Sequence, residues 1–400
     1  MIRVLPYSVA LDKLTDALRP LLQSEVVPTE RAAGKIVASD VISPATVPDF
    51  DRSVVDGYAV YSADVAASSQ SIPSVLRLAH TVGMGEEAAF RLRRGTCCYV
   101  PTGAMLPAGA DAVVMIEDVE RTGDEVFVSR PLRFAENVAP RGSDVARGSV
   151  IVRRGDRMTP TKLGACLAAG VTEVPVFRPL SFCLIATGDE LVDPRDDCPI
   201  GKIREINNAV LSAQISDFGT VVDAVRVKDD YDLLHQTASS ALTRADIVVV
   251  SGGSSVGAAD YTERLFASLG EIVVRGVAVK PGKPTVAATA SNKFLLGLPG
   301  HPMAAFVAFR LLFLRALLRA AGSDLPPPVV CRAAINFAGG KGRAAVMPVS
   351  LTHIPEATLA SPLFYQSGMI SVIAGADGFA FLSEETEGVA KGDPLEVYLL

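Results

Sequence analysis

The sequence predicts a multidomain α/β protein in which one domain holds a mostly parallel sheet and two others are rich in strands. Between residues 177 and 322, short apolar stretches alternate with amphipathic ones, which is typical of a parallel sheet covered by helices. Residues 48–140 consist of short alternating segments separated by glycine and proline, a pattern that favours β-structure. A proline-rich linker, Ser323–Pro328, precedes a second β-like region that ends at Leu400.

The bulk properties indicate a soluble globular protein. The chain has 400 residues, enough for about two to four domains, and 49% of them are apolar while 20% are charged. The net charge of −6 argues against a general nucleic-acid binder. The longest apolar stretch, Met303–Leu318, is interrupted by Arg310 and Arg315. We therefore expect no membrane partner, no signal peptide and a cytoplasmic location.

The six cysteines favour reduced thiols over a zinc site or a disulfide framework. None of them forms a C-x-x-C pair, and the chain has only four histidines. Free thiols are the ordinary state in a reducing compartment.

The segments that flank residues 48–140 are predicted to be helical. Tyr7–Ala38 is amphipathic with few breaks, and a later helix is marked by Thr159 as its cap, Pro160 in its first turn and Gly170 at its end. We therefore expect a helical linker domain of residues 1–47 and 141–176 with the β-rich domain of residues 48–140 inserted in it. The α/β domain then covers residues 177–322, and a C-terminal β domain covers residues 326–400.

A glycine-rich loop follows the apolar strand Ile247–Val250. Its sequence is SGGSSVG at residues 251–257, and a helix begins directly after it. Glycines allow the backbone to approach a ligand, and the free N–H groups at a helix start attract an anion. The P-loop and dinucleotide-binding patterns are absent, and a tight turn without a ligand is the alternative. We favour an anion site at Gly252, Gly253, Ser254, Ser255 and Gly257.

Acidic residues follow three neighbouring strands of the predicted sheet. Glu190 and Asp229 come after two strands, and Asp260 comes just past the glycine-rich loop. Because the carboxyl ends of parallel strands meet at one edge, these carboxylates are expected to converge there. Helix capping is the alternative for Asp230 and Asp260. We favour a Mg²⁺ site formed by Glu190, Asp229 and Asp260, because this ion also bridges to substrate phosphate.

Two rigid loops complete the predicted site. Lys280 and Lys283 flank a Pro-Gly turn that is suited to hold an oxyanion, although an ordinary solvated turn is the alternative. A second loop, Pro299–Pro302, opens the last long helix. This loop contains His301, and a single histidine at the start of a helix is more often structural than catalytic. Ser254 and Ser255 have no histidine nearby in the sequence, which argues against a hydrolase.

Together and in this order, the motifs resemble the molybdopterin molybdenumtransferase family, which includes MoeA and the E domain of gephyrin. The resemblance covers most of the chain and is weakest after Leu325. The matching segments are FDRSVVDGYAV, VPTGAMLPAGADAVVMIEDV, RGSDVARGSVIVRRG, ATGDELV, SGGSSVGAADYT, KPGKP and LPGHP.

This resemblance implies an elongated homodimer whose α/β domain binds molybdopterin. It also implies that adenylylated molybdopterin and molybdate, with Mg²⁺, are converted to molybdenum cofactor and AMP. The implied partners are the protein that adenylylates molybdopterin and the molybdoenzymes that receive the cofactor.

The resemblance also implies the role of individual residues. Asp56 and Thr102 of one protomer would face the α/β domain of the other. Glu190, Asp229 and Asp260 match acidic positions of catalysis or metal handling, and the glycine-rich loop matches the site of the pterin phosphate. The positions that match loops near molybdate and substrate are Lys280, Lys283, Pro299 and Pro302, and Arg343 and Ser367 match oxyanion contacts in the C-terminal domain.

The chain departs from the family pattern in SVVDG, in the C-terminal segment YQSGMISVIAGADGF and at four single positions. Glu205 replaces an aspartate, Ile206 a serine and His301 an asparagine, while Gly276 stands where a lysine is common, beside Arg275 as a substitute. These departures support a rival hypothesis, in which a catalytically weakened protein binds, stores or delivers molybdopterin or the finished cofactor. The intact acids at the other positions favour the enzyme.

Overall fold

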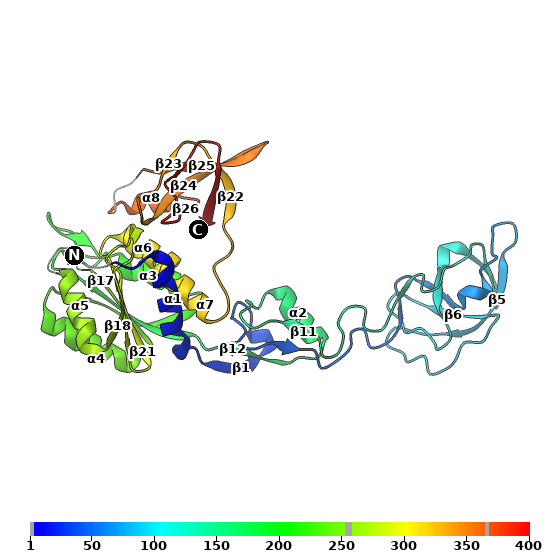
Figure 1. Cartoon of the computed structure of the whole chain (residues 1–400). Helices are drawn as coiled ribbons and strands as arrows, with labels where there is room; N and C mark the ends of the chain where they lie inside the picture. The colour runs from blue at the N-terminus through cyan, green and yellow to red at the C-terminus, as the bar shows by residue number, and fades with distance from the viewer. Residues whose placement is uncertain (1–3, 253–257, 365–367) are drawn as a thin grey trace.

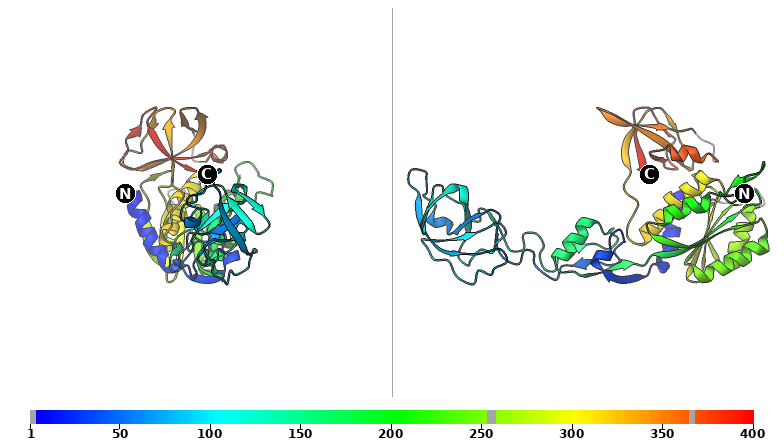
Figure 2. Two further views of the ribbon diagram at one scale, coloured as in Figure 1. Left: turned by 90° about the vertical axis from the view of Figure 1, so that its right-hand side faces the viewer. Right: turned by 180° about the vertical axis from the view of Figure 1, so that it is seen from behind.

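The chain forms an elongated molecule with an α/β domain at one end and the inserted β domain at the other. The computed structural model describes residues 4–252, 258–364 and 368–400. Figure 1 shows the C-terminal β domain stacked on the α/β domain, and a thin linker that carries the inserted domain away from both. Figure 2 shows the same separation from two other sides. Within the described ranges, every helix is too short or too polar to cross a membrane.

The α/β domain is built on a six-stranded sheet whose first four strands are parallel. Its strand order is β16-β13-β17-β21-β20-β18, and β20 and β18 are antiparallel to their neighbours. The strands are β13 (Leu180–Thr187), β16 (Gly219–Val227), β17 (Ile247–Gly252), β18 (Glu271–Arg275), β20 (Val286–Ala290) and β21 (Lys293–Leu298). The α/β fold class predicted from the alternating pattern is confirmed.

The register of this sheet brings the ends of its parallel strands to one edge. Thr187 of β13 lies opposite both Val227 and Gly252, and Ser251 lies opposite Leu298. Loops that leave these four strands therefore start side by side. This edge is where an open α/β sheet holds its ligands.

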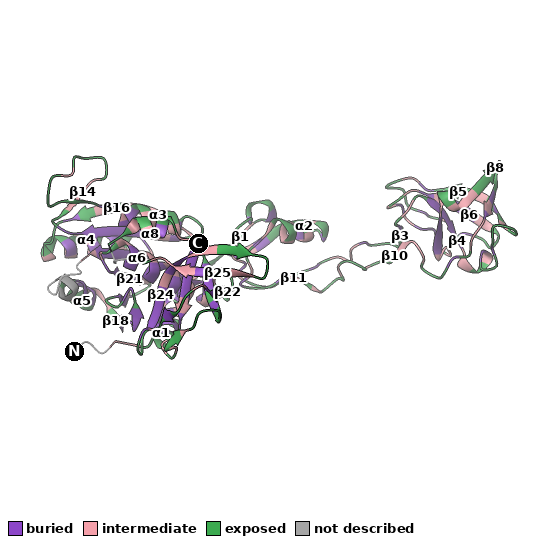
Figure 3. Ribbon diagram, turned by 90° about the horizontal axis from the view of Figure 1, so that it is seen from above, coloured by how far each residue is buried: buried purple, intermediate pink, exposed green. Residues whose placement is uncertain are grey.

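Helices cover both faces of the sheet because successive side chains of β13 point to opposite sides. Phe182 and Leu184 belong to one core, while Cys183 and Ile185 belong to the other. The first core includes residues of α1 (Tyr7–Leu18), α3 (Asn207–Ile215) and the continuous helix of α6 (Pro302–Val307), the π-helical η5 (Ala308–Leu314) and α7 (Arg315–Ala320). The second includes residues of α4 (Tyr231–Arg244) and α5 (Ala258–Leu269). Figure 3 shows the buried residues gathered along the strands.

The first segment differs in part from the predicted helices. The α-helix ends at Leu18, just before a short 3₁₀ turn, η1 (Arg19–Leu21), that contains Pro20. Ser24–Pro28 is strand β1, with alternating exposure, because its valines suit a half-buried strand. Moreover, α1 packs against the α/β domain, where Leu11, Leu14 and Leu18 are buried. The helical prediction is therefore wrong for Ser24–Pro28.

The linker is held together by short antiparallel pairs and one helix. Strand β1 pairs with β12 (Glu173–Phe177), and β2 (Val41–Ile42) pairs with β11 (Val150–Val152). Helix α2 (Pro160–Ala168) begins as predicted, since the Thr159 side chain accepts a hydrogen bond from the Lys162 N–H. The domain boundaries drawn from the sequence stay a prediction.

The inserted domain and the C-terminal domain each contain a six-stranded sheet. The first has the order β7-β4-β6-β5-β9-β8 and the second β19-β24-β25-β22-β28-β26. The inserted strands are β4 (Gly57–Val60), β5 (Ser74–Thr81), β6 (Thr96–Val100), β7 (Ala112–Met115), β8 (Val119–Thr122) and β9 (Glu125–Val128). The C-terminal strands are β22 (Val329–Ala333), β24 (Ala344–Ile354), β25 (Ala357–Pro362), β26 (Gly378–Leu382) and β28 (Pro394–Leu399).

One strand of the C-terminal sheet comes from the α/β domain. Strand β19 (Val279–Lys280) pairs with β24 through Val279 opposite Ala344 and Lys280 opposite Ala345. This pairing ties the Lys280 loop to the C-terminal domain. The remaining short elements are η2 (Thr29–Arg31), β3 (Arg52–Ser53), η3 (Ser62–Asp64), η4 (Ile116–Asp118), β10 (Val138–Ala139), β14 (Leu191–Val192), β15 (Ile203–Arg204), β23 (Phe337–Ala338), α8 (Ile370–Ala374) and β27 (Gly388–Val389).

Candidate functional site

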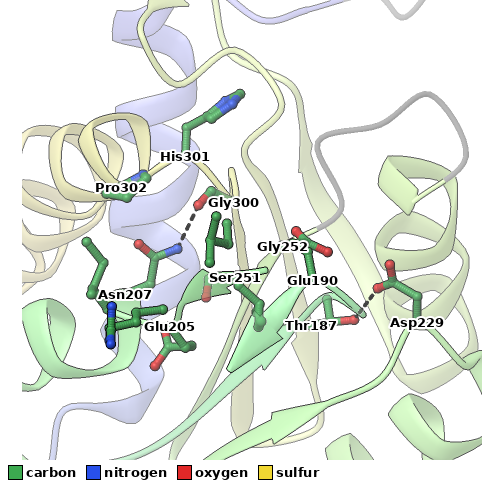
Figure 4. Close-up of a pocket in the computed structure, with 14 residues that line it drawn as sticks. Thr187, Glu190, Glu205, Asn207, Asp229, Ser251, Gly252, Gly300, His301 and Pro302 are labelled. Carbon is green, nitrogen blue, oxygen red and sulfur yellow. Dashed lines mark hydrogen bonds between the residues drawn. The ribbon is translucent and has the colours of Figure 1, made fainter. Parts of the chain in front are cut away.

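A cavity of ≈ 290 Å³ lies at the carboxyl edge of the parallel strands. We call it the first cavity, and Figure 4 shows the side chains that surround it. It is lined by Thr187, Glu190, Leu191, Ile203, Arg204, Glu205, Ile206, Asn207, Asp229, Ser251, Gly252, Gly300, His301 and Pro302. The site residues predicted from the sequence that meet here are Glu190, Asp229, Gly252 and Pro302.

Asp229 is oriented by a hydrogen bond from a neighbouring strand end. The buried Thr187 hydroxyl, at the end of β13, donates to Asp229 Oδ1 over 2.7 Å. Asp230 serves the fold instead, since its carboxylate accepts the Leu233 N–H at 2.8 Å and caps α4. Of these two consecutive acids, one therefore caps a helix and the other faces the cavity.

Gly252 and Gly300 allow two loops to meet at the cavity. Gly252 has a φ of +145°, and a Cβ built on it would lie 2.3 Å from the Thr187 carbonyl oxygen. A Cβ on Gly300 would lie 3.3 Å from Gly252 Cα. Gly252 therefore requires glycine, and a side chain at Gly300 would make a tight contact with it. The predicted site residues Gly253, Ser254, Ser255 and Gly257 lie outside the described residues, as does the side chain of Asp260.

Ser251 is a buried polar residue of the cavity that the sequence did not predict. Ser251 is only 2% exposed, and its Oγ has no hydrogen-bond partner among the described residues. Leaving a buried hydroxyl unpaired costs about 1–3 kcal/mol, so a bound ligand would satisfy it. The sequence signal that could have predicted this role is the position of Ser251 at the end of an apolar strand. Beside it, the Asn207 side chain donates to the Gly300 carbonyl oxygen at 2.9 Å.

Glu205, one of the departures from the family pattern, is a buried helix cap. Its Oε1 accepts the Asn208 N–H at 2.9 Å at the start of α3. Burial raises the pKa of this carboxyl, and the hydrogen bonds from the Asn208 and Asn207 backbones oppose that change. The side chain therefore stabilises the helix while it lines the cavity.

The carboxylates of the first cavity fit Mg²⁺ in the way that this ion usually binds. Among the described residues, no cluster of three His, Cys, Asp or Glu is arranged to hold a metal alone. Mg²⁺ commonly uses one or two carboxylates, with waters and substrate phosphates as its other ligands. Glu190 and Asp229 are exposed carboxylates that line one cavity, so they supply such a set.

A second cavity of ≈ 860 Å³ lies between the α/β and C-terminal domains. Pairing of β19 with β24 brings its two walls together. Its charged side chains are Lys280, Lys283, Lys341 and Arg343, and no carboxylate from the described part of the chain lines it. Pro299 also lines it, and the predicted Ser367 lies outside the described residues. The structure thus brings Lys280, Lys283, Pro299 and Arg343 together.

His301 lies between the two cavities and lines both. Figure 4 shows its ring directed away from Glu205 and Asn207. The ring faces the C-terminal domain, where a Cβ on Gly368 would lie 4.0 Å from its Cδ2. Its ring makes no hydrogen bond to any described residue. The structural role expected of this histidine is therefore not observed.

Arg275 does not substitute for the lysine that is common at the position of Gly276. Gly276 has a φ of +72°, in the region that favours glycine. The Arg275 guanidinium pairs with Glu263 Oε1 at 3.1 Å, and it lines neither cavity. The idea that Arg275 takes over that role therefore finds no support in its position.

Asp56 and Thr102 lie together in the inserted domain but far from both cavities of the same chain. The Thr102 N–H donates to Asp56 Oδ1 at 2.7 Å. Figure 1 shows their domain at the opposite end of the molecule from the α/β domain. Val54 lies two residues before Asp56, and the Ile116 N–H donates to the Asp56 carbonyl oxygen at 3.1 Å. Both apolar side chains are about half exposed.

Three family models together match nearly the whole chain. They are the MoeA N-terminal region (domain I and II) over residues 5–170, a "probable molybdopterin binding domain" over 183–319 and the MoeA C-terminal region (domain IV) over 330–400.

Individual relatives match the chain over similar lengths. A molybdopterin biosynthesis protein of Methanocaldococcus jannaschii is 31% identical, over 98% of this chain and 96% of its own. The molybdopterin molybdenumtransferase of Bacillus subtilis is 30% identical, over 94% and 90%. Two crystal structures of a molybdopterin biosynthesis MoeA protein from Pyrococcus horikoshii superpose with TM-scores of 0.80 and 0.85. They are 35% and 26% identical, and they cover 99% and 100% of both chains.

Proposed function

This chain belongs to the molybdopterin molybdenumtransferase (MoeA) family, and from that premise we propose how its own residues insert molybdenum into molybdopterin. It is a transferase of molybdenum cofactor biosynthesis. The substrates that we propose are adenylylated molybdopterin and molybdate, and the products are molybdenum cofactor and AMP. The observation that carries this proposal is the pair of neighbouring cavities, one with carboxylates and one with cations, that share the loop of residues 299–302.

The first cavity takes the phosphate end of adenylylated molybdopterin in this proposal. The unpaired Ser251 hydroxyl would donate to a phosphate oxygen, and the backbone at Gly252 leaves room for close approach. Glu190 and Asp229 would hold Mg²⁺, which neutralises and polarises a diphosphate when it is bound. Thr187 keeps the Asp229 carboxylate turned to the cavity.

The second cavity holds molybdate. Lys280 and Lys283 come from one wall and Arg343 from the other, so a dianion between them would be approached from two domains. These cations are exposed and line a shared concave surface, so they would attract a dianion and be stabilised by it. Pro299, which lines the second cavity in the loop that also borders the first, would keep the oxyanion next to the other substrate.

The complete site requires a homodimer. Asp56 and Thr102 cannot reach the cavities of their own chain, because the linker holds their domain at the far end. We propose that this pair faces the cavities of a second copy. In this arrangement the second copy would also cover the half-exposed side chains of Val54 and Ile116.

The proposed setting is the cytoplasm. Each of the six cysteines, all among the described residues, is a free thiol. This is the state expected in a reducing compartment. The protein that adenylylates molybdopterin would deliver the substrate, and recipient molybdoenzymes would take the product.

A cofactor carrier without turnover is the rival, and AMP release distinguishes the two. The purified protein is incubated with adenylylated molybdopterin, molybdate and Mg²⁺, and AMP is measured over time. We expect multiple turnovers, and a strong loss of rate in Asp229→Asn because a charged ligand is removed. Tight binding of the substrate without AMP release would favour the carrier and reject the enzyme.

A further inference from the structure

We infer that Lys341 and His301 are binding residues of the second cavity for a tetrahedral dianion, and that Lys341 makes the cavity selective for two negative charges over one. The inference deepens the proposed function, and it rests on that function only for the identity of the dianion as molybdate. Neither residue was assigned a binding role by the sequence.

The first argument is the charge of the cavity. Four cationic side chains line one space of ≈ 860 Å³, and none of the described residues that line it is acidic. None of these four cations forms an ion pair within the described part of the chain. Positive charges that share a concave surface raise the local concentration of anions, and they remain unfavourable to one another until an anion binds. Lys341 supplies a quarter of this charge.

The second argument is the backbone that carries Lys341. The turn Gly339–Gly342 is tightly packed, because a Cβ on Gly339 would lie 2.0 Å from the Thr386 carbonyl oxygen and one on Gly340 1.8 Å from that of Arg343. Lys341 is the only residue with a side chain in this turn. Its φ is +52°, a left-handed conformation that is unfavourable for a non-glycine residue. The turn therefore places one lysine on the cavity wall at a conformational cost.

The third argument is the position of His301. Its ring faces the C-terminal domain and has no partner among the described residues, although it lies at the opening between the two cavities. A neutral imidazole has one N–H to donate, and its ring extends further from the backbone than an asparagine amide. At this position it can donate to an oxyanion that sits where the two substrates meet.

The two residues would thus have different effects on the ion. Lys341 contributes charge, so its loss should matter more for a dianion than for a monoanion of the same shape. His301 contributes a directed hydrogen bond, so its loss should weaken both ions similarly. Molybdate and perrhenate are a suitable pair of probes, because both are tetrahedral tetraoxo ions and they differ by one charge.

The test is equilibrium binding of molybdate and perrhenate to the full-length protein without the pterin substrate. We expect Lys341→Met to weaken molybdate binding by about tenfold and perrhenate binding distinctly less. Lys341→Arg should restore most of the affinity. His301→Phe should weaken both ions by roughly the same few-fold factor.

Lys391→Met is the matched control. It removes one exposed lysine from the same domain, outside both cavities, and the Lys391 contact with Asn336 uses only its backbone N–H. Binding by Lys341→Met that equals this control would overturn the role of Lys341, and unchanged binding in His301→Phe would overturn that of His301. A wild-type protein that binds neither ion would overturn the inference as a whole.

AMP release and ion binding together distinguish failure of the proposed function from failure of this inference. If the ions bind with the expected pattern but wild-type protein releases no AMP, the enzyme proposal fails and the inference stands. If AMP is released while Lys341→Met binds molybdate like the control, the inference about Lys341 fails and the enzyme proposal stands.

Discussion

Thr187 decides how Asp229 presents its carboxylate to the first cavity. The hydroxyl is buried and donates over 2.7 Å from the end of β13. Thr187→Val keeps the shape of the side chain and removes only the hydrogen bond. We expect AMP release to slow by about tenfold while the free energy of unfolding falls by roughly 1 kcal/mol. Steady-state AMP release and urea unfolding measure the two effects.

The matching control lies at the other end of the same strand. The Ser181 hydroxyl donates to Asp246 Oδ2 at 2.8 Å, far along β13 from the cavity. Ser181→Ala should lower stability by a similar amount and leave AMP release unchanged. An equal loss of rate in both variants would mean that Thr187 acts through stability alone.

Glu205 makes stability depend on pH in a predictable direction. Burial raises the pKa of its carboxyl in the folded state, although the Asn208 and Asn207 N–H groups oppose the change. A raised folded pKa means that the protonated form is favoured by folding. This contribution to stability is full below the unfolded pKa of about 4.3 and is lost as the pH rises through the folded value.

The corresponding variant is Glu205→Gln, whose amide oxygen can still accept the Asn208 N–H. We expect the wild type to lose more stability than this variant between about pH 4 and pH 8. Urea unfolding at a series of pH values measures the difference. Parallel curves for the two proteins would show that the environment of Glu205 does not disfavour its charge.

At the scale of an element, helix α1 belongs energetically to the α/β domain. Leu14 is fully buried in the core that α1 shares with the sheet and with η5 and α7. Leu14→Ala should lower the free energy of unfolding by about 2–5 kcal/mol, because it removes buried methyl groups and leaves a cavity.

Val9→Ala, on the same helix, is the control for this prediction. Val9 is 41% exposed, so its loss should change stability by no more than about 0.5 kcal/mol. Urea unfolding compares the two variants. Equal effects would contradict the packing of α1 against this domain.

At the scale of the whole molecule, the distance between the inserted domain and the cavities makes a prediction about mixed dimers. Asp56→Asn and Asp229→Asn should each be inactive alone. If the site combines Asp56 of one copy with Asp229 of the other, a mixed dimer contains one intact site. Random mixing should then restore about a quarter of wild-type AMP release.

Co-expression with two affinity tags isolates the mixed dimer, whose one intact site of two should give about half of wild-type AMP release. A mixed dimer without activity would reject the shared site. Activity in either single variant would instead remove that residue from the proposed machinery.

Local patterns were enough to predict the α/β sheet and the acids at its edge. Strand and helix periods are short-range properties, and the register of parallel strands then places Glu190 and Asp229 in one region. Features that depend on pairing between distant segments could not be predicted from local patterns. Ser24–Pro28 is a strand because it pairs with Glu173–Phe177, which lies on the far side of the inserted domain in the sequence.

By itself, the sequence determined the fold class, the glycines and acids that follow the strands and the resemblance to one family, because each depends on neighbouring residues. Only the tertiary structure decided which of these residues meet. Pairing of β19 with β24 builds the second cavity, and it gathers Lys280, Lys283, Lys341 and Arg343 from two domains. The tertiary structure also places His301, which the sequence shows only as the start of a helix, between two cavities. The sequence could not predict this because cavities are formed by segments that are distant in the chain.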